Sequence, residues 1–192
     1  MCGIDLLASK NSDCLVYSVG SDNDIQFEQS IRKYTGCEIH TFDPTVLSHD
    51  FVGHNVSTFH PWGLGRDGEK AERGEFSWHG QSLQTIVGKL EHTNRNIDVF
   101  KIDCEGCEWK VMPDIFKDIQ KGLLKIDQIQ VEMHNHRNRA ELERLFEGAD
   151  AAGMRLFHKE RNGWGCEGYR CVEYAFASSA FSRKVNKHFI CS

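Results

Sequence analysis

Short runs of β-forming apolar residues alternate along this chain with segments that have helical apolar spacing. The apolar runs fall at residues 14–20, 38–42, 55–59, 97–102, 126–131, 154–158 and 171–177. Strands that alternate with helices are joined by crossover connections, so they run parallel within one sheet. The last two runs are separated only by the glycine-rich residues 161–169, which favours an antiparallel hairpin at the C-terminal end.

The segments with helical spacing are expected to pack on both faces of that sheet. They fall at residues 25–34, 47–52, 82–90, 108–121 and 138–152. Asp24 before the first segment and Gly36 after it are typical helix boundaries. The predicted fold is therefore an α/β fold with a mostly parallel, twisted sheet of about seven strands, helices on both faces and a C-terminal antiparallel hairpin.

The longest predicted connection covers residues 61–80, which are rich in glycine and charged side chains. Long loops in compact domains often cover a substrate. A surface excursion without a role in binding is an equally good interpretation of the same residues.

The size of the chain fits one domain. Its 192 residues, of which 40% are hydrophobic and 27% charged, predict a single domain over residues 1–192 with a core at about residues 14–177. The formal net charge of −5 gives no general attraction to phosphate backbones, so no nucleic-acid partner is expected.

No apolar run in the sequence is long enough to span a membrane. Residues 1–8 carry no basic segment followed by a sustained apolar stretch, and therefore do not resemble a signal peptide. The expected location is cytoplasmic, or the secretory pathway if an upstream targeting segment has been removed.

Eight cysteines occur, at positions 2, 14, 37, 104, 107, 166, 171 and 191. Cys104 and Cys107 form a C-x-x-C pair, and together with Cys166 and Cys171 they could supply a zinc site. The favoured interpretation is that they are small, buried cysteines beside a strand end. An even number also permits disulfides, although a chain of this length does not need them to fold.

Ligands of open parallel sheets bind at the carboxyl ends of the strands, so the residues that follow each strand are the candidate site. Gly20, Ser21 and Asp22 follow the first predicted strand. A glycine lets the backbone pass close to a ligand, and the next helix offers free N–H groups. The G-x-G-x-x-G fingerprint is missing, which disfavours a nicotinamide or flavin dinucleotide. An ordinary strand-to-helix turn is the alternative.

Phe42 and Asp43 end the second predicted strand. A carboxylate at this place, about 20 residues after the glycine, accepts hydrogen bonds from the ribose hydroxyls of a nucleoside. The alternative is that Asp43 only starts a turn with Pro44. The position at the predicted switch point of the sheet favours nucleoside binding.

Three carboxylates, those of Asp103, Glu105 and Glu108, follow the fourth predicted strand. Their mutual repulsion favours a cation or a polar ligand nearby. Asp103 and Glu105 are candidates for binding the amino group of a cofactor, for a general base or for a metal ligand. Glu108 is expected only to stabilise the start of the next helix.

A glutamate and two histidines follow the fifth predicted strand, at Glu132, His134 and His136. His134 is a candidate general base because the pKa of imidazole lies near neutral pH. A divalent metal bound by His136, Asp103 and Glu132 is an alternative that the sequence does not favour.

These strand ends together resemble a known family. Residues 101–109 resemble the K-[IM]-D-x-E-G-[AC]-E-W signature of FkbM-like methyltransferases, and in particular their methyltransferase-like branch. The first strand of that branch is similar to residues 15–20, its second to residues 37–44, and its fifth-strand motif to Glu132-Met-His134. The resemblance extends over most of residues 14–177.

The resemblance implies a Rossmann-like methyltransferase fold that uses S-adenosylmethionine to methylate a hydroxyl group of a small molecule or a sugar. The expected cofactor-binding residues are Gly20, Ser21, Asp22, Phe42, Asp43 and Asp103. The expected catalytic residues are Asp103, His134 and Glu105. A domain that binds the cofactor without catalysis is the first alternative, and a nicotinamide-dependent oxidoreductase is the second.

Overall fold

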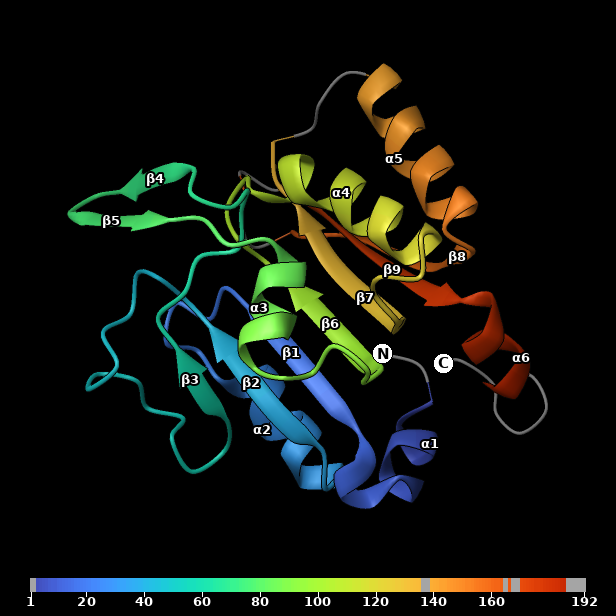
Figure 1. The fold of residues 1–192 in the computed structure, drawn as a ribbon, viewed down its shortest axis with the longest axis horizontal. Coiled ribbons are helices and arrows are strands. Elements are labelled where there is room, and N and C mark those ends of the chain that lie inside the picture. Colours follow the sequence, from blue (N-terminus) through green and yellow to red (C-terminus); the bar gives the residue numbers. More distant parts are fainter. Residues whose placement is uncertain (1–2, 136–138, 164–165, 167–169, 186–192) are drawn as a thin grey trace.

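A computed structural model describes residues 3–135, 139–163, 166 and 170–185. These residues form a seven-stranded sheet in the order β3-β2-β1-β6-β7-β9-β8 (Figure 1). Neighbouring strands are parallel except for β9, which runs antiparallel to both β7 and β8. The strands are β1 (Leu15–Val19), β2 (Glu38–Phe42), β3 (Thr58–His60), β6 (Ile97–Ile102), β7 (Ile126–Met133), β8 (Met154–Arg161) and β9 (Val172–Ser178). The predicted mostly parallel sheet and its C-terminal antiparallel pair are confirmed.

Helices pack against both faces of this sheet. Figure 1 shows α3, α4 and α5 on one side of it and α2 on the other. The helices are α1 (Ile4–Ser9), the 3-10 turn η1 (Asn11–Asp13), α2 (Gln26–Tyr34), α3 (Leu83–Lys89), α4 (Glu108–Gln120), α5 (Arg139–Ala151) and α6 (Ser179–Val185).

The two faces of the sheet bury different side chains, because successive residues of a strand point to opposite sides. Tyr17 of β1 lies in the larger core cluster together with Ile86 of α3 and Met112 of α4. Its neighbour Val16 lies in a second cluster together with Ile31 of α2. The central strands are therefore apolar on both sides, as expected for a parallel sheet covered by helices.

The register of the central strands aligns their carboxyl ends. Val19 pairs with Phe42 of β2 on one side and with Ile102 of β6 on the other. Each of these three residues is the last of its strand. The residues that follow them therefore emerge side by side at one edge of the sheet, which is the predicted switch point.

The structure corrects the expected helix at residues 47–52, which form a series of turns. In this segment Phe51 is buried, whereas Leu47 and Val52 are 50% and 61% exposed. One buried residue does not make the apolar stripe that holds a helix against a core. The following strand also begins later than expected, because β3 covers only Thr58–His60.

The expected loop at residues 61–80 contains a β-hairpin of β4 (Lys70–Arg73) and β5 (Phe76–His79). Gly74, with φ of 58°, provides the left-handed residue that its two-residue turn requires. Ala71 pairs with Trp78 across the hairpin, and most of the other side chains are charged or exposed. Figure 1 shows the hairpin projecting from the body of the domain. Its weak apolar pattern explains why the sequence predicted a loop.

Two short terminal helices were not predicted from the sequence. They are α1, which buries Leu7, and α6, which buries Phe181. Helices of six and seven residues show too little periodicity to be recognised. No helix within the described ranges is both long and apolar enough to cross a lipid bilayer.

The favoured interpretation of Cys104, Cys107, Cys166 and Cys171, as small buried cysteines beside a strand end, needs correction, because these cysteines are paired in disulfides. Disulfides join Cys14 to Cys37, Cys104 to Cys107 and Cys166 to Cys171. The alternative zinc site formed by the last two pairs is also wrong, because sulfurs joined in disulfides are not thiolate ligands. The other two cysteines, at positions 2 and 191, lie outside the described residues.

Candidate active site

The loop that follows β1 passes directly over the end of β6. Gly20 has φ of 77°, and a Cβ atom at this position would lie 1.5 Å from the carbonyl oxygen of Asp103. The Gly20 amide donates to the carbonyl of Phe42, and Lys101 Nζ donates to the carbonyl of Gly20 over 2.6 Å. Only glycine therefore fits between the two strand ends.

Asp43 ties the end of β2 to the same loop. Its Oδ2 accepts hydrogen bonds from the backbone amides of Ser21 and Asp22, each over 2.8 Å, and its Oδ1 accepts from the amide and the hydroxyl of Thr45. Burial tends to raise the pKa of Asp43, but these hydrogen bonds outweigh it and hold the pKa below its ordinary value. Asp43 is thus an ionised carboxylate that shapes the loop.

The turn between β6 and α4 presents Asp103 and Glu105 to the same edge. Glu105 and Gly106 both adopt positive φ, of 58° and 113°. The Glu108 carboxylate is fully buried under the turn and accepts hydrogen bonds from the amides of Cys104 and Gly106, each over 2.8 Å. The expectation that Glu108 only stabilises the start of α4 is therefore incomplete, because it also holds the turn.

His134, just after β7, lies among these carboxylates. Its Nδ1 lies 3.0 Å from Glu108 Oε1, and its Nε2 lies 3.7 Å from both Asp103 Oδ1 and Glu105 Oε2. Burial lowers the pKa of His134, but the hydrogen bond to Glu108 and the charges of Glu108, Glu105 and Glu132 outweigh it and raise the pKa to about 9. His134 is therefore an imidazolium cation at neutral pH.

One cavity of about 180 Å³ brings most of the predicted cofactor residues together. Gly20, Ser21, Asp22, Asp43 and Asp103 line it, and so does Glu105, which was predicted as catalytic. Phe42 is fully buried and does not line the cavity, because its ring packs against core aromatic rings. His134 reaches this region through its contacts with Asp103 and Glu105.

The structure adds five residues to this cavity that were not predicted as part of the site, namely Asp24, Gln26, Phe27, Arg73 and Lys101. Phe27 comes from α2, Lys101 from β6 and Arg73 from the β4–β5 hairpin. The guanidinium of Arg73 lies 3.6 Å from Glu105 Oε1. Lys101 belongs to the motif at residues 101–109. No sequence signal connected Arg73 to that motif, because the contact between Arg73 and Glu105 joins segments that are distant in the chain.

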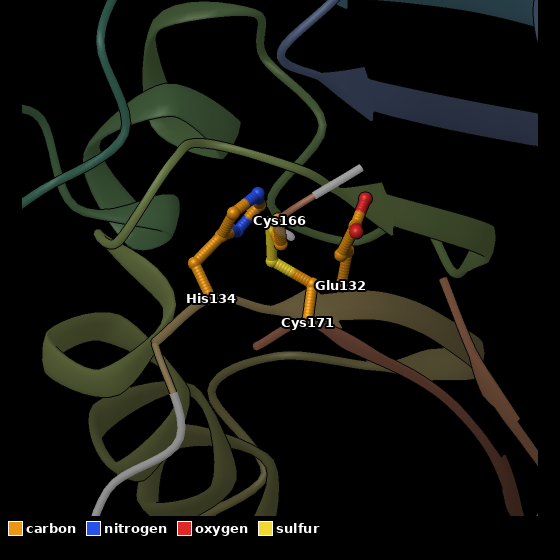
Figure 2. Close-up of side chains that lie close together, drawn as sticks. All are labelled: Glu132, His134, Cys166 and Cys171. Carbon is orange, nitrogen blue, oxygen red and sulfur yellow. A yellow bond between two sulfur atoms is a disulfide. The ribbon is translucent and has the colours of Figure 1, made fainter. Parts of the chain in front are cut away.

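Figure 2 shows Glu132, His134, Cys166 and Cys171 close together beside this site. Their potential ligand atoms lie within 4.8 Å of one another. The disulfide between Cys166 and Cys171 removes two of the four from metal binding. The less favoured metal site that included His136 involves a residue outside the described ranges.

The sheet order, the antiparallel last pair and the cavity at the ends of β1 and β6 define a Rossmann-like methyltransferase domain. Two solved structures support this fold. The Methanococcus jannaschii fibrillarin pre-rRNA processing protein matches with a TM-score of 0.51 at 6% identity, covering 88% of this chain and 67% of that one. The METTL16 methyltransferase domain matches with a TM-score of 0.51 at 12% identity, covering 93% and 65%.

The sequence comparisons agree with the fold. A family model described as a methyltransferase domain matches residues 1–178, and the chain belongs to this family. Probable methyltransferase-like protein 24 from Homo sapiens is 32% identical over 130 residues, and that from Rattus norvegicus is 31% identical over the same length. Each match covers 66% of this chain but 34% of the relative, so this chain spans about a third of their length.

Proposed function

We propose that this domain transfers the methyl group of S-adenosylmethionine to a hydroxyl group of a small acceptor. One observation carries the proposal: residues from three separate strand ends, namely Gly20, Asp43 and Asp103, line a single cavity. This is the place where sheets of this class bind a nucleoside ligand. The matched family of methyltransferase domains supports the same reaction class.

The cavity residues fit this cofactor. Gly20 leaves space where a Cβ atom would collide with the neighbouring strand. Asp22, Asp103 and Glu105 give the cavity an acidic wall, which suits a ligand with a positively charged amino group and sulfonium. When bound, S-adenosylmethionine supplies an electrophilic methyl group to an acceptor held nearby.

Within this proposal Asp103 accepts the proton of the acceptor hydroxyl. His134 was the other candidate base, but its pKa of about 9 leaves it protonated at neutral pH. A protonated imidazole does not accept a further proton, whereas it can orient a carboxylate by attraction. We therefore assign His134 and Glu105 positioning roles beside Asp103.

The test compares Asp103→Asn with the wild-type domain and with Asp5→Asn, a control at an exposed position on α1. Calorimetry with S-adenosylhomocysteine measures cofactor binding, and mass spectrometry of a hydroxyl acceptor panel measures methyl transfer. We expect Asp103→Asn to keep measurable cofactor binding and to lose at least about 100-fold in turnover. Near-normal turnover would contradict the assignment of Asp103.

Wild-type protein that binds the cofactor but methylates nothing in the panel would support the alternative of a non-catalytic binding domain. Wild-type protein that does not bind it would contradict the proposal itself.

Two finer assignments remain part of the proposal. The signature-like residues 101–109 support membership of the FkbM-like branch, in which a sugar hydroxyl is a typical acceptor. The disulfides among the described residues favour an oxidising compartment, and therefore the secretory pathway over the cytoplasm.

A further inference from the structure

A second cavity, of about 340 Å³, adjoins the cofactor cavity. Phe27, Lys101 and Asp103 line both cavities. The rest of its wall comes from Ile102 of β6 and from β7, β8 and β9, the strands beyond β6 in the sheet. The shared residue Asp103, the proposed base, thus lies where an acceptor in the second cavity would meet the cofactor.

The alternation of residues along β7 explains why this second cavity is polar. Val131 and Met133 point into the main core, on the side where α4 and α5 pack. Gln130 and Glu132 point to the opposite face, because successive residues of a strand alternate. Glu173 of β9 pairs with Glu132 across the antiparallel ladder, so two carboxylates lie side by side on that face.

The wall of the second cavity carries more negative than positive charge. Its acidic residues are Asp103, Glu132, Glu160 and Glu173, and its basic residues are Lys101 and His158. Lys101 is already engaged by the carbonyl of Gly20 and by Asp103. Negative charge is therefore left over on the side of the cavity formed by β8 and β9.

Glu173 is the least compensated of these carboxylates. Among the described residues it makes no hydrogen bond or ion pair. Burial raises its pKa, and so do the neighbouring charges of Glu132, Glu160 and Asp103, against a smaller opposite effect of His158. A cationic ligand in this cavity would relieve that repulsion.

A second observation, independent of the carboxylates, also indicates a ligand. The amide nitrogen Nε2 of Gln130 is buried and has no hydrogen-bond partner among the described residues. Gln130 lines the second cavity. A buried donor without an acceptor costs free energy, and an oxygen atom of a bound molecule would satisfy it.

We infer that the second cavity is the acceptor site and that it binds a small amine which also carries a hydroxyl or carbonyl oxygen. The ammonium group lies against Glu173, Glu160 and Glu132, and the oxygen accepts a hydrogen bond from Gln130. This inference rests on the proposed function and adds the substrate class. The same wall repels phosphate and carboxylate groups, which disfavours an anionic acceptor in this cavity.

The test uses three probes with one skeleton and different charge: tyramine, a cation; tyrosol, which is neutral; and 4-hydroxyphenylacetate, an anion. Calorimetry first measures S-adenosylhomocysteine binding, so that failure of the proposed cofactor is recognised separately. Each probe is then titrated into the S-adenosylhomocysteine-loaded domain. We expect tyramine to bind at least about tenfold more tightly than tyrosol, and the anion to bind most weakly.

Two matched variants locate the effect. Glu173→Gln keeps the shape of the side chain and removes its charge, so it should reduce the preference for tyramine over tyrosol severalfold. Glu147→Gln, at an exposed position on α5, should leave that preference unchanged. Absence of tyramine binding, equal binding of tyramine and tyrosol, or an unchanged preference in Glu173→Gln would each overturn the inference.

Discussion

Nδ1 of His134 lies 3.0 Å from Oε1 of Glu108, and both residues are buried. This pair joins the end of β7 to the first residue of α4. The same Glu108 carboxylate accepts two backbone amides of the turn that carries Asp103 and Glu105. One buried ion pair therefore sets the position of the acidic wall of the cofactor cavity.

The first prediction concerns the pH dependence of stability. The pKa of His134 is raised from 6.5 to about 9 in the folded protein. Its stabilising contribution, on the order of 3 kcal/mol, is complete below pH 6.5 and is lost as the pH rises toward 9. The melting temperatures of the wild type and of His134→Gln, measured between about pH 6 and about pH 9.5, should therefore converge at the alkaline end of this range.

His49→Gln is the matched control, because His49 is an exposed histidine whose side chain is 78% accessible. Its melting temperature should follow that of the wild type across the same pH range. A constant difference between His134→Gln and wild type at every pH would show that His134 does not carry the charge.

The second prediction concerns Gly20. Replacement by alanine places a Cβ atom 1.5 Å from the carbonyl oxygen of Asp103 and strains a residue with φ of 77°. We expect Gly20→Ala to lose about 2 kcal/mol or more of stability and to lose S-adenosylhomocysteine binding. Gly88→Ala is the control, since Gly88 lies in α3 with open space around its Cβ position and should be neutral or slightly stabilising. Denaturant unfolding and calorimetry measure both effects.

The third prediction compares the two oxygen atoms of the Asp43 carboxylate, which accept hydrogen bonds from different donors. In Asp43→Asn one oxygen becomes an NH₂ group, which cannot accept the amide donors that meet that oxygen. The expected result is a loss of about 2 kcal/mol in stability and at least about tenfold weaker S-adenosylhomocysteine binding. Thr45→Val removes only the hydroxyl donor to Oδ1, so it should change cofactor binding little. Equal effects of both substitutions on binding would contradict this assignment.

The fourth prediction concerns the disulfide between Cys14 and Cys37, which closes a segment of 23 residues. Its loss in the Cys14→Ala/Cys37→Ala variant should cost about 3 kcal/mol, because the unfolded chain gains freedom. Reductant should destabilise the wild type by a similar amount. It should affect the double variant little, because the other two disulfides among the described residues join positions only three and five apart. A large effect of reductant on the double variant would show that a different disulfide dominates.

The sequence predicted the strands and most helices of the core because their apolar periodicity is strong and local. The strand predicted at residues 97–102 matches β6, and that at 38–42 matches β2. The weakly periodic segments were predicted wrongly, namely the turns at 47–52 and the hairpin at 70–79. In these segments few side chains are buried, so the sequence pattern carried little information.

The sequence by itself determined that Gly20, Asp43 and Asp103 follow three strands and meet at one edge, since parallel strands align their carboxyl ends. It could not determine the charge of His134, which depends on carboxylates from other elements. Nor could the sequence predict that Arg73 lies close to Glu105, or that Glu173 lies beside Glu132. These relationships join residues far apart in the chain, and only tertiary packing decides distances of that kind.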